Sequence, residues 1–371
     1  MRASDLLSAI DEVASGAIAD GAVAVDRDRV FPRASCEALA SAGAFGLLVP
    51  TERGGAGGGL ADLAAACESV GAACASSGMV FLMHSVAAAT VAGGDGPQEV
   101  LERMRTDALG TLAFSERGTG AHFYSPELKA VRRDGGMVID GRKSFVTSGG
   151  EADFYLLLVQ APDGEGAECY AVDSGRSGIS FDGDWEGLGM AGNSSIAMTL
   201  DGLEVRDEDR IGAPGGGGDL VFGVVAPVFL VGLAAVNVGI GAAASRSAVE
   251  HAKARSYPDG STLVELQTIQ HAIADMDLAV RQARLLVREA ARLADAGEEA
   301  LVAVMEAKIA ATEMAAAVTQ RALEICGGQA YTPALPIERH LRDARAGAVM
   351  APTNGVLRNW VGKALAGLPV P

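Results

Sequence analysis

The stretch LQTIQHAIADMDLAVRQARLLVREAARLA, residues 266–294, decides the fold class of this chain. Its apolar positions recur at alternating steps of three and four residues, which predicts one continuous stripe along a long helix. Such a stripe is typical of a helix that packs in a bundle. The stripe consists of Leu266, Ile269, Ile273, Met276, Val280, Ala283, Val287, Ala290 and Ala294.

Two further helices are predicted around this stripe. Residues 298–326 have a helical pattern, and Gly327-Gly328 supplies a C-terminal cap. Residues 220–244 carry little charge, and their length would also suit a membrane span. Because Pro227 and Asn237 interrupt this stretch and no basic flank precedes it, we predict a buried core helix.

The middle of the chain has a different pattern. The glycine-rich residues 212–218 lack the Lys-Ser/Thr ending of a phosphate loop, so we predict a flexible connection there. Before it, turns are predicted at Asp134-Gly135-Gly136 and Asp201-Gly202. The strand candidates are residues 129–133, 137–139, 154–159, 196–200 and 203–205. Short strands at this spacing are typical of a small barrel or sandwich.

The sequence therefore predicts a mainly α fold with an inserted β domain. The N-terminal part again has helical patterns, for example over residues 60–75 and 78–92. The three parts are an N-terminal helical domain at 1–107, a middle β domain at 108–211 and a C-terminal helical bundle at 212–371. The two helical parts could pack as one unit.

Composition excludes several classes of protein. The 371 residues are 49% apolar and 21% charged, which excludes a disordered chain. The formal net charge of −17 argues against nucleic acid as a partner. The five cysteines include no CxxC and no Cys/His cluster, so we expect no metal site and a reducing, cytoplasmic location. Acidic residues near the N-terminus argue against a signal peptide.

Two loops beside strand candidates hold most of the residues that could carry chemistry. They are LAFSERGTGAHF at 112–123 and DGRKSFVTSGGEAD at 140–153. Loops rich in Gly, Ser and Thr expose backbone N–H groups that can bind an anion or the edge of a flavin ring. The chain has no nucleophile elbow, HExxH or Walker loop, and no GxGxxG on a strand–helix turn.

These loops, with two further motifs, resemble the acyl-CoA dehydrogenase superfamily over nearly the whole chain. The motifs are GAFGLLVP at 43–50 with ERGG at 52–55, Ser115-Glu116 with Gly118 and Gly120, residues 143–153, and EICGG at 324–328 with Arg339 and RDAR at 342–345. The resemblance implies an N-terminal helical domain, a middle β-barrel and a C-terminal four-helix bundle. It also implies FAD, and a homodimer or homotetramer.

By position, the resemblance assigns the inner part of an FAD site. Ser115, which follows Phe114, would reach the pyrimidine side of the flavin. Phe145 would lie against the isoalloxazine, and Thr147 would donate a hydrogen bond to N5 and raise the flavin's electron affinity. From the residues alone, Phe145 could instead be strand core and Thr147 a turn residue.

The outer part of the FAD site departs from the family's pattern. Gly328 and Thr353 would lie near a flavin phosphate or the adenosine. Ala121 stands where a serine is usual, and Arg255 lies in a segment that differs from the usual Arg-x-x-Phe-Gly. Glu324 replaces a common glutamine. These changes predict weaker FAD retention or a shifted pose.

The resemblance further implies a carboxylate base that this chain lacks. Dehydrogenases of the family remove the α-proton of an acyl thioester while hydride leaves the β-carbon. The usual position, nine residues after Arg342, holds Ala351. The alternative position, placed by its spacing to Gly239, holds Phe229. Neither side chain can accept a proton.

Two histidines are candidate replacements, and three functions stay open. His84 lies on a helix that, in the family, commonly lines the substrate cavity, and His122 ends the first flavin loop. Either imidazole could act as acid or base. Alternatively, His84 could be a packed core residue and His122 could cap a loop.

The first of the three functions is oxidation of the Cα–Cβ bond of an acyl thioester with a non-standard base. The second is a flavin-dependent monooxygenase, resembling the dibenzothiophene monooxygenase branch. The third is a non-catalytic partner subunit. An electron-transfer flavoprotein or a flavin reductase would be the redox partner, and no membrane is expected.

Overall fold

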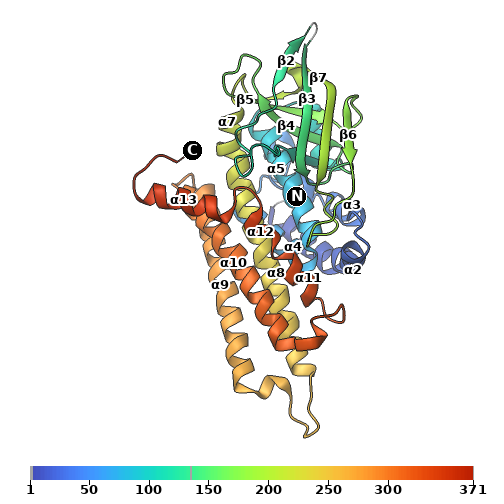
Figure 1. Cartoon of the computed structure of the whole chain (residues 1–371), viewed down its shortest axis with the longest axis vertical. Helices are drawn as coiled ribbons and strands as arrows, with labels where there is room; N and C mark the ends of the chain where they lie inside the picture. The colour runs from blue at the N-terminus through green and yellow to red at the C-terminus, as the bar shows by residue number, and fades with distance from the viewer. Residues whose placement is uncertain (1–2, 134–135, 371) are drawn as a thin grey trace.

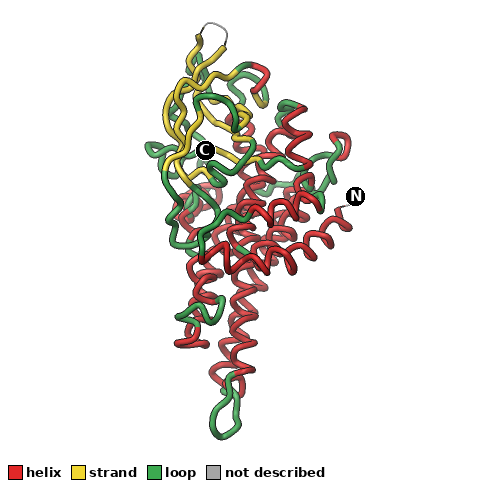
Figure 2. Tube along the Cα trace, turned by 90° about the vertical axis from the view of Figure 1, so that its right-hand side faces the viewer, coloured by secondary structure: helices red, strands yellow, loops and turns green. Residues whose placement is uncertain are grey.

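The computed structural model describes residues 3–133 and 136–370. Figure 1 shows strands at one end of an elongated molecule, N-terminal helices beside them, and long helices extending away. Figure 2, turned by a quarter, shows the same separation of strands from the longest helices. The mainly α fold with an inserted β domain is therefore confirmed.

The N-terminal part packs around one apolar helix. Its helices are α1 (Ala3–Val13), α2 (Ala19–Arg27), α3 (Arg33–Ser41), α4 (Leu60–Ala73), α5 (Ala75–Gly93) and α6 (Gln98–Thr106). Every residue of α5 from Ala75 to Ala92 is buried. This burial on all sides explains why α5 shows no amphipathic pattern.

The middle part forms two four-stranded sheets, in the orders β1-β4-β5-β8 and β2-β3-β7-β6. The strands are β1 (Gly110–Ala113), β2 (Ala130–Arg133), β3 (Gly136–Val146), β4 (Phe154–Gln160), β5 (Ala167–Asp173), β6 (Ile179–Asp182), β7 (Ile196–Val205) and β8 (Arg210–Ile211). β1 runs parallel to β4, and the other strand pairs are antiparallel. Residues at the ends of β1 and β3 line one cavity together with Met79 and Met83 of α5.

The turn predicted at Asp201-Gly202 is wrong. Both residues lie inside β7, and Gly202 has a φ of +62°. The register with β3 shifts between the pairs Ile139–Leu203 and Gly141–Leu200. An extra residue on one strand makes a bulge, so the chain bends here instead of reversing. Of the other predicted turn, Asp134 and Gly135 lie outside the described residues, and the strands that flank it pair as predicted.

The C-terminal part contains the predicted long helices, α8 (Ala226–Ala254), α9 (Gln267–Asp295) and α10 (Leu301–Cys326). Shorter helices stand before and after them: α7 (Gly217–Leu220), α11 (Ile337–Asp343), α12 (Ala346–Val349) and α13 (Asn354–Leu365). The stripe on α9 is buried from Met276 to Ala290, whereas Leu266 precedes the helix and is 46% exposed. The predicted flexible connection is shorter than expected, because α7 begins at Gly217.

Two helical segments, Ala75–Gly93 and Gly217–Ala254, are long and apolar enough to cross a membrane by composition alone. Their most apolar windows are 100% and 67% buried within the protein. α8 packs against α4 at close range, since a Cβ added at Gly239 would lie 2.3 Å from the carbonyl oxygen of Glu68. This burial is typical of core helices.

Candidate active site

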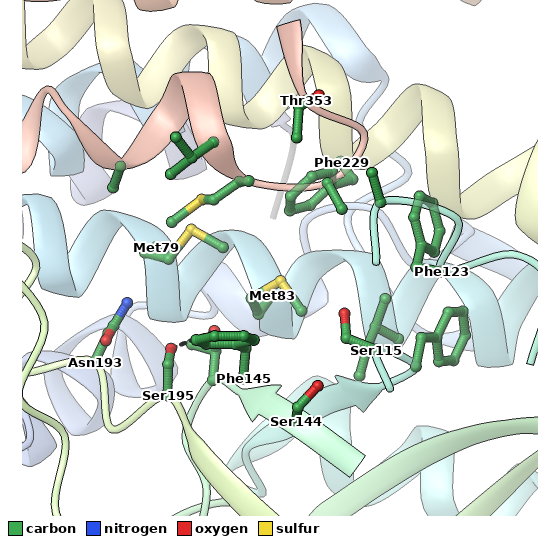
Figure 3. Close-up of a pocket in the computed structure, with 18 of the residues that line it drawn as sticks. Met79, Met83, Ser115, Phe123, Ser144, Phe145, Asn193, Ser195, Phe229 and Thr353 are labelled. Atoms are coloured by element: carbon green, nitrogen blue, oxygen red, sulfur yellow. Dashed lines mark hydrogen bonds between the residues drawn. The ribbon is translucent and has the colours of Figure 1, made fainter. Parts of the chain in front are cut away.

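A cavity of about 730 Å³ lies where the middle part meets α5 and the bundle. Figure 3 shows Met79 and Met83 of α5 on one side and Phe145 of β3 facing them. The cavity joins three separate regions of the chain, and its lining includes Phe114, Ser115, Ala121, Phe123, Ser144, Thr147, Trp185, Met190, Asn193, Ser195, Phe229, Val349, Met350, Ala351 and Thr353. Of the nine predicted cofactor residues, it brings together Phe114, Ser115, Ala121, Phe145, Thr147 and Thr353.

Phe145 is the most unusual residue in the lining. It lies between half-buried Ser144 and buried Val146 at the end of β3, yet the residue is 71% exposed and has a φ of +51°. A bulky residue in the left-handed region is strained, and such strain collects at functional sites. An uncovered ring held in this way suits a planar aromatic ligand, so Phe145 is not the core residue that its strand position alone would allow.

Two hydroxyl groups are paired beside Phe145. Thr147 Oγ1 and Ser195 Oγ lie 3.0 Å apart and are both almost fully buried. The backbone of Thr147 is fixed as well, because its carbonyl accepts a hydrogen bond from Thr111 Oγ1 at 2.8 Å. A pair of hydroxyls needs only one donor between them, so the second hydrogen can point to a ligand in the cavity.

A buried ion pair holds the loop that carries Ser115. Lys143 Nζ donates to Glu116 Oε1 and to the carbonyl of Leu158, both at 2.5 Å. Glu116 Oε2 accepts from the backbone N–H groups of Glu127 and Leu128. Burial lowers the pKa of Lys143, and Glu116 opposes that effect. With both of its oxygens bonded, Glu116 is not a free base.

Phe229 and Ala351 both face the cavity, at the two positions where the family resemblance places the base. Among the described residues that line it, Glu116 is the only carboxylate, and no imidazole is present. A side chain able to accept an α-proton is therefore missing from the described lining.

Neither histidine has the geometry of a catalytic residue. His84 is wholly buried and stacks on Phe45, with Nε2 bonded to the carbonyl of Phe45 and Nδ1 accepting from Gly110 N–H. Burial lowers its pKa to about 4. His122 is exposed and touches Tyr124, and neither histidine lines the cavity. The catalytic assignments of His84 and His122 are therefore corrected to a core and a surface role.

Arg255, Glu324 and Gly328 do not join the cavity. Arg255 caps the end of α8 and lies over Tyr257, while Glu324 pairs with Arg321 near the end of α10. Gly328 is exposed just after α10. Figure 1 places both helix ends at the base of the bundle, away from the strands. Within one chain these three residues therefore lie apart from Phe145 and the other cavity residues.

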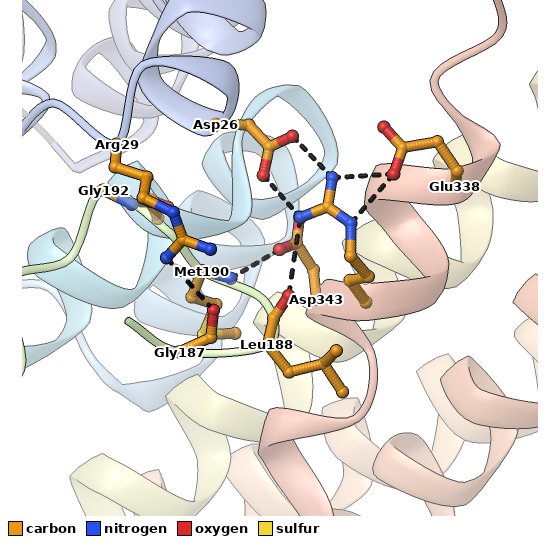
Figure 4. Close-up of polar contacts among 10 residues, drawn as sticks. Asp26, Arg29, Gly187, Leu188, Met190, Gly192, Glu338 and Asp343 are labelled. Carbon is orange, nitrogen blue, oxygen red and sulfur yellow. Dashed lines mark hydrogen bonds and ion pairs between the residues drawn. The ribbon is translucent and has the colours of Figure 1, made fainter. Parts of the chain in front are cut away.

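Sequence reasoning missed the wall formed by residues 185–195. Met190 N–H donates to Asp343 Oδ1 at 2.6 Å, and Arg29 Nη1 donates to the carbonyl of Gly187 at 3.3 Å (Figure 4). Arg29 Nη1 also lies 3.3 Å from the carbonyl of Trp185. Burial raises the pKa of Asp343 to about 6. Arg342, beside it, bridges Asp26 and Glu338. The RDAR motif thus anchors this wall, but nothing in its sequence indicated which segment it would hold.

Lys308 was also missed. It is fully buried in α10, and its Nζ donates to the carbonyl of Pro352 at 3.1 Å and to Asn354 Oδ1 at 2.9 Å. Burial lowers its pKa to about 7. Through these bonds Lys308 holds in place the segment that brings Ala351 and Thr353 to the cavity.

The residues that line the cavity fit the isoalloxazine part of FAD. Phe145 offers an uncovered ring, Thr147 and Ser195 a spare hydrogen, and Ser115 a hydroxyl on the other side of Phe145 (Figure 3). Arg117 is the only cation in the described lining. The described lining of one chain therefore offers few groups that could bind the phosphate and adenosine parts of FAD.

This fold and site define a flavin-dependent oxidoreductase. The acyl-CoA dehydrogenase N-terminal, middle and C-terminal domains match residues 3–106, 111–203 and 231–366. The chain belongs to the acyl-CoA dehydrogenase superfamily, and FAD is its cofactor.

Relatives support the assignment along the whole chain. Cyclohex-1-ene-1-carbonyl-CoA dehydrogenase of Geobacter metallireducens is 30% identical, with 97% of this chain and 96% of that protein covered. Human mitochondrial short-chain specific acyl-CoA dehydrogenase is 28% identical, with 91% and 83% covered. The structure of butyryl-CoA dehydrogenase from Megasphaera elsdenii matches with a TM-score of 0.92, 25% identity and 98% of each chain covered.

Proposed function

We propose that the protein oxidises the Cα–Cβ bond of a small acyl thioester, with the β-hydride passing to FAD and the α-proton passing to a base carried by the substrate or by the solvent, because the described lining holds no free carboxylate. The observation that carries this proposal is the apolar slot between Phe145 and the side chains of Met79, Met83 and Phe229. An acyl chain is flat and apolar enough to lie there, and the named relatives act on acyl-CoA compounds.

FAD bound here would supply the two-electron acceptor for the hydride of the β-carbon. The side chains of this protein position the reactants and exclude water. Phe145 would support the ring from one face and the Thr147–Ser195 pair would donate a hydrogen bond at its edge, while the acyl chain would lie between the opposite face and Met79, Met83 and Phe229. Since positioned general bases contribute about 100- to 10,000-fold, we expect slow turnover with simple acyl groups. A substrate with an acidic α-proton, or with its own base, would escape this limit.

The test is anaerobic mixing of the FAD-loaded protein with saturated acyl-CoA thioesters of increasing length. Loss of the flavin's visible absorption together with formation of the 2-enoyl product supports the proposal. If every thioester binds but none is oxidised over hours, Cα–Cβ oxidation is not the function.

A second function is favoured by the apolar character of both Phe229 and Ala351. A flavin-dependent monooxygenase takes electrons from a reductase and needs no base for an α-proton. Product that forms only with oxygen and a flavin reductase, and not with a dye acceptor under nitrogen, would favour this alternative.

We further propose a homo-oligomer in the cytoplasm. Arg255, Glu324 and Gly328 lie at the base of the bundle, where only a second subunit could bring them to an FAD molecule. Light scattering combined with FAD titration of the Arg255→Ala variant tests this. An oligomer in which Arg255→Ala lowers the FAD affinity supports shared sites, and a monomer that holds FAD contradicts them.

If the protein oxidises an acyl thioester only when it is mixed with a homologous subunit, it is instead a partner subunit.

A further inference from the structure

Asn193 is a buried polar side chain in the described cavity lining whose amide has no protein partner. Asn193 is only 1% exposed, and its Oδ1 is buried without a hydrogen bond. Its Nδ2 likewise donates to no residue in the described part of the chain. Buried amides are almost always bonded, because each unsatisfied group costs free energy. Such an exception in a cavity lining needs an explanation.

The backbone around Asn193 prevents the side chain from finding a partner. Its carbonyl accepts from Ser148 N–H at 2.9 Å, and its N–H donates to the carbonyl of Met190 at 3.1 Å. Gly192 N–H donates to Ser76 Oγ, and Asp343 holds Met190. The wall is therefore bonded to three other elements, and the amide is left facing the cavity.

The position of Asn193 indicates which ligand would satisfy it. Figure 3 shows Asn193 and Ser115 on opposite sides of Phe145. If Ser115 is on the pyrimidine side, the amide lies toward the other end of the ring system, whose dimethylbenzene edge has no hydrogen-bonding group. The partner is then on the substrate. The charged residues in the described lining are Arg117 and the already paired Glu116, so the ligand group would be uncharged.

We propose that Asn193 is a specificity-determining residue that hydrogen-bonds an uncharged polar group, such as an amide or hydroxyl, at the far end of the acyl chain. This inference rests on the proposed acyl-thioester function. The amide can turn about its last bond to present either its N–H or its carbonyl oxygen, because no protein bond holds it. Plain hydrocarbon chains would leave it unsatisfied.

The experiment compares two CoA thioesters that differ only in the end group, a terminal carboxamide and its isopropyl isostere, over a series of chain lengths. Binding to the FAD-loaded protein is read from the shift of the flavin spectrum under nitrogen, so turnover is not required. We expect the carboxamide to bind about 5- to 150-fold more tightly at the best length. The Asn193→Ala and Asn193→Ser variants should abolish this preference.

Ser194→Ala is the matched control. Ser194 Oγ donates to the carbonyl of Gly149 at 2.8 Å and does not line the cavity, so its loss should leave the preference intact. Equal binding of the two end groups by the unaltered protein overturns the inference, with no variant needed. So does an Asn193→Ala variant that loses FAD affinity and keeps the preference. If neither series binds, the thioester function itself is wrong and the inference fails with it.

Discussion

The wall formed by the ends of β1 and β3 and the start of β7 carries polar groups at the positions to which the sequence resemblance assigns flavin binding. On the facing wall, formed by α8 and the segment before α13, the two positions for a base hold Phe229 and Ala351. The walls come from different parts of the chain, and each is anchored separately, one by Lys143 and the other by Lys308. Flavin binding and proton removal can therefore change independently in this fold.

The largest effect is expected from giving the second wall a base. Ala351→Glu should raise the rate of anaerobic flavin bleaching by a bound acyl-CoA about 100- to 10,000-fold, which is the usual contribution of a positioned general base. Ala351→Gln, which has nearly the same shape but cannot accept the proton, should leave the rate unchanged.

Both variants should keep the FAD affinity of the unaltered protein, because the flavin wall is separate. An equal rise with glutamate and glutamine would mean that shape, and not basicity, limits turnover. Phe229→Glu tests the other position in the same assay.

The next largest effect concerns the anchor of the flavin wall. Lys143→Met leaves the buried Glu116 without its counter-ion, so the free energy of unfolding should fall by about 3–5 kcal/mol. Urea unfolding measures this directly. The neighbouring Arg142 pairs with Asp182 at the surface, with both side chains more than half exposed, and Arg142→Met should cost under about 1 kcal/mol. Similar losses for the two variants would contradict the role given to the buried pair.

A smaller effect is expected at His84, on the pH dependence of the free energy of unfolding and not on catalysis. In the folded protein its pKa is about 4, below the ordinary 6.5, so unfolding takes up a proton between these values. The stability that neutral His84 contributes is full above pH 6.5 and is lost as the pH falls toward 4. His84→Asn should reduce this loss, measured by urea unfolding at pH 7 and pH 5.

His340, with a pKa lowered by burial to about 3, acts in the same direction and is unchanged in that variant. Asp343, whose pKa is raised, acts in the opposite direction between about pH 4 and 6. The difference between variant and parent therefore isolates His84. Turnover per folded molecule at pH 7 should stay the same, and a hundredfold loss would restore His84 as a catalytic candidate.

Features that depend on local periodicity could be predicted from the sequence. The stripe from Met276 to Ala290 is buried as its spacing indicates, and Ala351, the position reached by counting nine residues from Arg342, lies in the cavity lining. Features that depend on the partner strand or helix could not. Asp201-Gly202 has the composition of a turn, but pairing with β3 makes it a bulge.

The same limit applies to single polar residues in the site. His84 lies on the right helix, but the helix turns its ring toward Phe45 and Gly110 instead of the cavity. Asn193 stands between two strands in a segment without a recognisable motif. Its importance follows from the absence of a partner, which only the packed structure reveals.

The smallest effect is expected at the edge of the flavin wall. Thr147→Val keeps the shape of the side chain but removes the hydroxyl that, paired with Ser195, leaves a spare hydrogen for the flavin, so one hydrogen bond to FAD worth about 1 kcal/mol is lost. Titration of the apoprotein with FAD should show an affinity about fivefold lower, and Thr147→Ser should restore it. Because Thr147 is on the opposite wall from Ala351, combining Thr147→Val with Ala351→Glu should lower FAD affinity and raise the bleaching rate by the same factors as the single variants. If the FAD affinity or the bleaching rate of the double variant differs from the product of the single effects, the two walls are energetically coupled. A substitution at the position of the base would then also change flavin binding.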